Sequence, residues 1–306
     1  MPQLQKKREF NYAIATDGAR QILWGFFKKF VIADNCASIV DPIYANYETL
    51  PASSLAVGLF FYAMQMYADF SGYSDMAIGI SRLLGLNITR NFNYPYFAQN
   101  IADFWRRWHM SLTSWLTDYV FTPASITFRD FDKWGSIIAI LITFLVSGIW
   151  HGANWTFVLW GFLYGCYFIP LILKGKMNKK KDIPISRKLP TFKEFSNIAA
   201  TFLLVMFTFV IFRSDSIGQA FGYYKGLFSS SLLAVPEISE KYNATTTAIL
   251  IVAMLVVEWL QRDKPHALQI SFIKSPVARV GVYYAVIFII LLCGASRVTQ
   301  FIYFKF

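Results

Sequence analysis

The stretch WGSIIAILITFLVSGIWHGANWTFVLWGFLYGCYFIPLIL, residues 134–173, decides the fold because it contains no Asp, Glu, Lys or Arg. A membrane-crossing helix needs roughly 17–25 mostly apolar residues, so this stretch is long enough for two short spans. One histidine, His151, stands near its middle. An ionisable group in hydrocarbon is costly, and one that is kept there is a candidate functional residue. We therefore expect a membrane hairpin in which His151 is the first residue to consider for chemistry.

The composition of the whole chain is that of a membrane protein. Of its 306 residues 56% are hydrophobic and 15% are charged, whereas charged residues make up about 25% of an ordinary soluble domain. Further nearly charge-free runs cover residues 49–68, 195–212, 242–257 and 280–296. With the two spans of the hairpin they predict six membrane-spanning helices. The sequence thus predicts an all-α, polytopic integral membrane protein, with residues 1–306 as a single domain.

Residues 21–32 form a weaker candidate span. Lys28 and Lys29 interrupt this apolar run. We expect the segment either to lie in the interface or to cross the membrane with both lysines snorkelling toward water.

The basic residues indicate topology. The net charge is +11, but these residues flank spans instead of forming a surface interleaved with exposed aromatics, so no nucleic-acid partner is predicted. By the positive-inside rule, the densest cluster, residues 174–193, is expected in the cytoplasm. A second basic loop, residues 262–279, follows two spans later and returns to the same side. His266 lies in that charged loop and is predicted to be a solvated surface residue.

Neither a metal site nor a bound cofactor is predicted. Cys36, Cys166 and Cys293 are scattered and odd in number, which argues against a disulfide framework and a thiolate metal site. The sequence also lacks a glycine-rich phosphate loop, His-x-x-x-His and Cys-x-x-Cys pairs, and a Gly-x-Ser-x-Gly elbow. Nucleotide-driven transport, a zinc enzyme and a serine hydrolase therefore lack their signatures.

His151 can act as a base. If its helix continued, Ser147, His151 and Asn154 would share a face, and Ser147 or Asn154 could hold the imidazole in one tautomer. A neutral imidazole can take the proton of a hydroxyl group as its oxygen attacks an acyl thioester, and return that proton to the leaving thiolate. The alternative is a structural histidine at a helix break caused by Gly152.

Residues 87–133 are too polar to span yet dense in aromatic side chains. We expect interfacial or re-entrant helices that line a cavity. Residues 103–116 have helical periodicity, which places His109 on an apolar stripe. His109 either takes part in the chemistry or binds lipid phosphates, and Arg106 and Arg107 either hold the phosphates of a coenzyme or anchor to lipid headgroups.

Two carboxylates, Asp69 and Asp75, stand at the end of an apolar run, and Ser71 shares a helical face with Asp75. They could orient a polar acceptor or couple an ion; alternatively, Asp69 caps a helix or pairs with an arginine. A proton-coupled secondary transporter would use Asp69, Asp75 and His151. Transporters commonly show repeated halves, and no such repeat is present in the sequence, so an enzyme is favoured.

The motifs in this order resemble the membrane-bound O-acyltransferase (MBOAT) family, and within it the bacterial branch that acts in alginate O-acetylation. They are YADFSGYSD (67–75), NFNYPY (91–96), DFWRRWHMSL (103–112), GIWHGANW (148–155) and FRSDS (212–216), and the likeness extends through residues 301–304. The resemblance implies that His151 is the essential intramembrane histidine and His109 a second, less uniformly required one.

The resemblance further implies helices around a tunnel in the inner membrane of a bacterium. An acyl group would move from a cytoplasmic donor, acetyl-CoA or another acyl thioester, toward a polysaccharide acceptor, often through a periplasmic acetyltransferase partner. Basic flanks at Lys133 and Lys174 place His151 toward the outer face, whereas a tunnel places it deeper, and we expect the deeper position.

Relative to the family, amino-terminal helices are expected to be missing, which leaves an inactive fragment as an alternative. Residues 118–125, DYVFTPAS, replace a usual glycine-containing turn, so the acceptor stays open.

Overall fold

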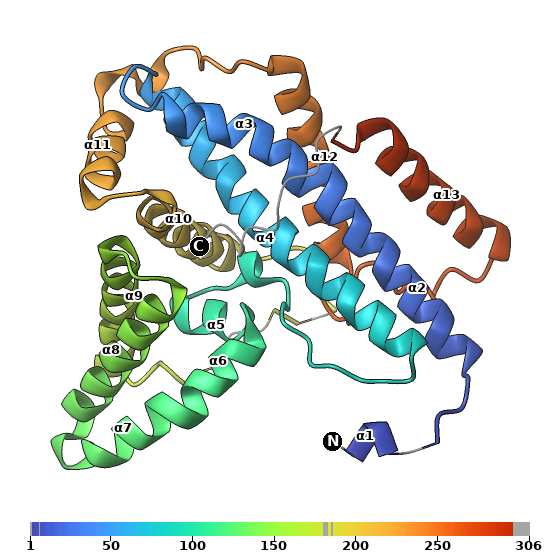
Figure 1. Ribbon diagram of the computed structural model, residues 1–306, viewed down its shortest axis with the longest axis horizontal. Helices are drawn as coiled ribbons and strands as arrows, with labels where there is room; N and C mark the ends of the chain where they lie inside the picture. Colours follow the sequence, from blue (N-terminus) through green and yellow to red (C-terminus); the bar gives the residue numbers. More distant parts are fainter. Residues whose placement is uncertain (1, 6, 180–182, 185, 296–306) are drawn as a thin grey trace. The chain divides into compact units, whose positions relative to one another are not determined.

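The chain is described by a computed structural model that covers residues 2–5, 7–179, 183–184 and 186–295 (Figure 1). Within these ranges all regular secondary structure is helical and there are no strands, which confirms the all-α prediction. The chain divides into two compact units, each described by itself. The first unit contains the described residues of 1–43, 61–93 and 238–305, and the second those of 44–60 and 94–237.

Five helices are long and apolar enough to cross a membrane: Arg129–His151, Trp155–Leu173, Phe192–Arg213, Lys241–Leu260 and Pro276–Cys293. They correspond to five of the six predicted spans, and the chain is a multi-pass membrane protein. The sixth predicted span, residues 49–68, is not among them; most of these residues lie in the 32-residue helix α4 (Ala52–Leu83). Ser296, at the end of the last predicted span, lies outside the described residues, as do residues 301–304.

The first unit is built on two helices in close contact. After the short α1 (Pro2–Gln5), α2 (Tyr12–Phe26) continues through a π-helical segment, η1 (Phe27–Ala33), into α3 (Asp34–Ala45). Alongside it runs α4 (Figure 1). Glycines make this approach possible, since a Cβ on Gly25 would lie 2.6 Å from the Gly72 carbonyl oxygen and one on Gly18 2.8 Å from that of Gly79. Small residues at such contacts let helix backbones approach closely. The helices α12 (Lys241–Leu260) and α13 (Pro276–Cys293) complete the unit.

The second unit contains the predicted hairpin, formed by α8 (Asp132–His151) and α9 (Trp155–Leu173), which lie side by side in Figure 1. Gly148 packs against the Phe157 carbonyl and Gly161 against that of Phe144. At the open end, Lys133 Nζ donates to the Leu173 carbonyl at 3.0 Å. The bend at the other end begins directly after His151, so the hairpin prediction is confirmed.

Short helices precede the hairpin and longer ones follow it. The segment expected to be interfacial folds into η2 (Pro95–Phe97), α5 (Ile101–Trp105), α6 (Met110–Leu116), η3 (Thr117–Phe121), α7 (Thr122–Thr127) and η4 (Arg129–Phe131). After the hairpin come α10 (Phe192–Arg213), α11 (Ile217–Leu227) and η5 (Ser230–Leu233). The basic cluster precedes α10, and its Lys180, Lys181 and Asp182 lie outside the described residues.

Candidate active site

His151 lies at the bend of the α8–α9 hairpin, enclosed by aromatic rings. It is the last residue of α8, because Gly152 adopts φ 153°, a conformation that L side chains rarely take, and ends the helix. The imidazole is 9% exposed. Four aromatic rings stand with their centroids 5.0–6.1 Å from that of the imidazole: Trp150, Phe157, Trp160 and Phe212. The site therefore combines a buried base with an apolar enclosure.

The helix break changes the predicted roles of the two neighbours of His151. Asn154 does not share a helix with His151; it caps α9, accepting from the Thr156 amide at 3.1 Å and donating to the Asp215 carbonyl at 2.9 Å. The shared face of Ser147, His151 and Asn154 required the helix to continue through Asn154, and Gly152 interrupts it. Ser147 does lie one turn before His151 in α8, but its buried hydroxyl has no hydrogen-bond partner in the part of the chain that the structure describes. Neither prediction of a residue that orients the imidazole is confirmed.

His109 belongs to the same neighbourhood. Its ring lies 6.3 Å from that of Trp150, which in turn contacts His151. His109 lies outside the five candidate spans, and burial lowers its pKa to about 4. The ring is therefore neutral at neutral pH, which favours a role in hydrogen bonding over one in binding phosphate as a cation.

The backbone at His109 differs from the prediction. The helix expected over residues 103–116 is interrupted, since α5 ends at Trp105, α6 begins at Met110 and His109 has φ 43°. The two helices are joined by a turn in which the Trp108 amide donates to the Phe104 carbonyl at 2.9 Å. This break turns His109 out of the helical stripe on which the sequence placed it.

Arg106 and Arg107 are held by protein groups. Arg107 Nε donates to Asp103 Oδ1 at 3.0 Å, and Arg106 Nη1 donates to the Met177 carbonyl at 3.1 Å. Their side chains remain 32% and 17% exposed, respectively. These contacts tie the region of His109 to the segment after α9 while leaving part of each guanidinium accessible.

Asp69, Ser71 and Asp75 come together in the first unit around two buried lysines. Lys29 Nζ lies 2.8 Å from Asp69 Oδ1 and 2.9 Å from Asp34 Oδ1. Lys28 Nζ lies 2.6 Å from Asp75 Oδ2 and donates to Ser71 Oγ at 2.9 Å. Of the two alternatives for residues 21–32, the one in which both lysines snorkel toward water is wrong, because they are 3% and 8% exposed and paired with carboxylates. The pairing partner of Asp69 is a lysine, where the sequence suggested an arginine.

The family follows from comparison with known proteins. Residues 7–212 match the model of MBOAT, the membrane-bound O-acyltransferase family. The chain belongs to the MBOAT family. It is 33% identical to a probable alginate O-acetylase of Azotobacter vinelandii, with 81% of this chain and 48% of that protein aligned. It is 29% identical to a peptidoglycan O-acetyltransferase of Helicobacter pylori, with 100% of this chain and 60% of that protein aligned.

A third relative is named for a different acyl group and a different acceptor. This MBOAT chain is 32% identical to a teichoic acid D-alanyltransferase of Bacillus subtilis, over 64% of the chain and 50% of that protein. The chain spans about half the length of the curated relatives it matches. The family match covers both the motif of His109 and that of His151.

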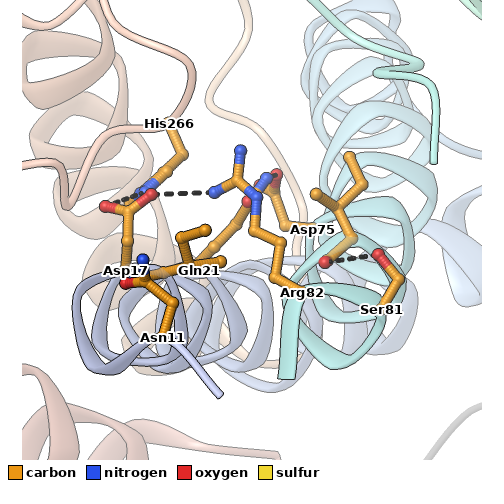
Figure 2. Close-up of polar contacts among 9 residues, drawn as sticks. Asn11, Asp17, Gln21, Asp75, Ser81, Arg82 and His266 are labelled. Atoms are coloured by element: carbon orange, nitrogen blue, oxygen red, sulfur yellow. Dashed lines mark hydrogen bonds and ion pairs between the residues drawn. The ribbon is translucent and has the colours of Figure 1, made fainter. Parts of the chain in front are cut away.

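The third histidine of this MBOAT chain contradicts the sequence prediction. His266, expected on the solvated surface, is 2% exposed, and its Nε2 donates to Asp17 Oδ1 at 3.2 Å. Arg82 Nη1 approaches the other oxygen of the same carboxylate at 2.8 Å. Figure 2 shows the imidazole and the guanidinium both directed at Asp17. The loop after α12 is thereby fastened to α2 and α4.

This anchor gives the first prediction for the MBOAT chain. His266→Ala is expected to destabilise the loop by about 1–3 kcal/mol, because it removes a buried hydrogen bond and its packing, and amide hydrogen exchange of residues 261–275 should rise. The hydrogen bond from His266 is the main cause that lowers the pKa of Asp17. Since that pKa is lowered, the stabilisation is present at neutral pH and is lost as the pH falls through the lowered value.

The matched control lies in the same loop. Lys264→Ala removes an ion pair with Asp263 whose lysine is 39% exposed, and it should leave exchange of the loop unchanged. Equal protection of the loop in His266→Ala and wild type would show that the buried contact does not hold it.

Sequence reasoning missed Thr156 and Trp160, which belong to the surroundings of His151. Trp160 contacts the imidazole of His151, and Thr156 lies one turn before Trp160 in α9. The predicted helical face followed the spacing of a single helix, whereas Thr156 and Trp160 belong to α9, which Gly152 separates from α8. The available signal was the pair Gly148 and Gly161, whose lack of side chains brings α8 and α9 of this MBOAT chain together.

Proposed function

We propose that this MBOAT chain acts as a membrane O-acyltransferase. In the proposed reaction, an acyl group, most simply acetyl, passes from a thioester donor such as acetyl-CoA on the cytoplasmic side to hydroxyl groups of an extracytoplasmic polysaccharide such as alginate. The family match and the names of the relatives support the reaction class. The observation that carries the proposal is the buried His151, set among aromatic rings at the hairpin bend beside His109.

The proposed mechanism makes His151 the general base. The neutral imidazole accepts the proton of the acceptor hydroxyl while its oxygen forms a bond to the thioester carbonyl carbon. The tetrahedral intermediate collapses, the carbon–sulfur bond breaks, and the thiolate takes the proton back from the imidazolium. The enclosure by Trp150, Phe157, Trp160 and Phe212 supports this role because it excludes water that would hydrolyse the thioester.

The other predicted site residues receive roles from their contacts. The partly exposed Arg106 and Arg107 are proposed to meet the phosphates of the donor near the cytoplasmic end of α9. Asn154 is proposed to act indirectly, by fixing the start of α9. Asp69, Ser71 and Asp75 are proposed to stabilise the first unit, since buried lysines already neutralise both carboxylates. That pairing also speaks against ion coupling by Asp69 and Asp75.

The location and partners follow from the same proposal. The protein would reside in the plasma membrane, in contact with the lipid bilayer, and would hand the acyl group to a periplasmic acetyltransferase or directly to the polymer. Acetate analysis of cell-surface polymers from a deletion strain identifies the acceptor. Unchanged acetylation of every polymer would contradict the proposal.

The deciding experiment measures radiolabelled acetyl transfer from acetyl-CoA in membranes that contain the protein, with and without a protonophore. Transfer that does not depend on the proton gradient supports the acyltransferase. Gradient-dependent solute uptake without acetyl transfer would instead show a secondary transporter. Absence of both would show that the chain is inactive by itself.

His109→Ala is expected to reduce acetyl transfer about 10-fold or more without abolishing it, because a buried neutral imidazole next to the base orients a substrate by hydrogen bonding. His109→Gln, which keeps a hydrogen-bonding group, should recover part of the rate. Turnover numbers of the two variants in the same membranes check this. Wild-type turnover in His109→Ala would return His109 to a structural role.

A further inference from the structure

Three of the buried polar groups that have no hydrogen-bond partner in the described ranges belong to the helix faces of α8 and α9 that carry His151 and Trp160. The side-chain atoms Ser147 Oγ, Thr156 Oγ1 and Trp160 Nε1 are shielded from solvent, and none makes a hydrogen bond to any residue in the described ranges. Their residues are 1%, 0% and 3% exposed. A buried donor without a partner costs about 1–3 kcal/mol, so native proteins seldom keep one, and three at one place call for an explanation.

Together with His151, the residues of these three groups form two matching pairs. Ser147 and His151 are four residues apart in α8, and Thr156 and Trp160 are four residues apart in α9, so each pair shares a helix face. The two faces meet, since the rings of His151 and Trp160 stand 5.1 Å apart with an interplanar angle of 89°. The close approach of Gly148 and Gly161 to the opposite helix holds the faces together.

We infer that Ser147, Thr156 and Trp160 form the site that receives the carbonyl oxygen of the acyl donor. The inference rests on the proposed function and deepens it by assigning catalytic residues besides His151. When the acceptor oxygen bonds to the carbonyl carbon, the π electrons of the carbonyl move onto its oxygen, which becomes an oxyanion. Two hydroxyl groups and an indole N–H can donate to that oxygen while His151 holds the proton. The charge disappears again when the carbon–sulfur bond breaks.

The aromatic enclosure strengthens this arrangement. Hydrogen-bond donors that are fixed in a site without water stabilise developing charge far better than donors in water do, and they need no reorganisation during the reaction. The packing of Trp160 against Phe212 and Tyr164, with ring centroids 5.3 and 5.0 Å away, fixes the orientation of its N–H group.

The test compares variants that remove a single donor with variants that keep it. Trp160→Phe and Thr156→Val should each lower kcat for acetyl transfer from radiolabelled acetyl-CoA about 10²-fold, the usual cost of losing one oxyanion donor. KM should change little, because the donors act on the transition state more than on the ground state. Thr156→Ser keeps the hydroxyl group and should retain most of the rate.

Trp155→Phe is the matched control. It removes the N–H of an indole that is 74% exposed in the first turn of α9, next to Thr156, and it should leave kcat unchanged. Wild-type kcat in Trp160→Phe and Thr156→Val would overturn the inference, as would an equal loss in Thr156→Ser and Thr156→Val, which would show that packing matters and the hydroxyl does not. In both cases wild type and Trp155→Phe still transfer acetyl, so the proposed function stands. Absence of transfer by wild type itself would overturn the proposed function together with the inference.

Discussion

His151→Ala is expected to lower acyl transfer by about 10²–10⁴-fold, the usual effect of removing a general base. The protein should still insert into the membrane, because the apolar helices on either side are unchanged and one side chain at the bend does not determine insertion. The measurement is transfer of radiolabelled acetyl groups per molecule of protein recovered in the membrane fraction. His151→Gln should be equally inactive, since an amide fills a similar space and accepts no proton.

Ile149→Ala serves as the control for this prediction. Ile149 lies two residues before His151 in the last turn of α8, and its side chain is 63% exposed. It should transfer acetyl groups at the wild-type rate. Near-normal turnover in a well-expressed His151→Ala protein would eliminate the proposed mechanism and leave His151 as a structural residue at a helix break.

Lys29→Met is expected to cause the largest loss of stability, about 3–5 kcal/mol, the typical cost of removing one partner of a buried ion pair. Lys29 contacts both Asp34 and Asp69, whose side chains are 0% and 3% exposed. Its removal leaves two buried carboxylates without the ammonium group that compensates them. The thermal unfolding midpoint of the purified protein in detergent measures the effect.

Two further variants make the second prediction specific. Arg129→Met breaks an ion pair with Asp130 in which the side chains are 75% and 86% exposed, and it should leave the midpoint almost unchanged. Combining Lys29→Met with Asp69→Asn should recover part of the loss, because one uncompensated carboxylate is gone. A midpoint for Lys29→Met equal to that of Arg129→Met would show that the buried ion pairs do not stabilise the fold.

The sequence predicted those parts of the fold that depend on local patterns. The hairpin of residues 134–173 was found because apolar side chains without charges can satisfy their backbone only as helices in a bilayer. The same argument went too far at Asn154, where helical spacing was extended across Gly152. The glycine was recognised as a possible break, but the spacing alone did not decide between a break and a continuous helix.

The sequence did not allow us to predict which charged side chains are buried. His266 stands among charged neighbours, which is the pattern of a surface loop, yet its partner Asp17 lies 249 residues away along the chain. Lys28 and Lys29 interrupt an apolar run, and their carboxylate partners Asp69 and Asp75 come from another helix. Whether a charge is buried depends on a partner that packing brings to it, and no local pattern encodes that partner.

The backbone at Gly152 has a consequence for how sequence variation in this protein is read. Residues with a side chain rarely adopt its φ of 153°, and a Cβ placed there would lie 2.9 Å from the ring of Phe157. Although glycine has no reactive group, substitution of Gly152 is therefore expected to be tolerated as poorly as substitution of His151. In a survey of random variants, loss of function at position 152 would reflect the shape of the chain, whereas under the proposed mechanism loss of function at position 151 would reflect the chemistry.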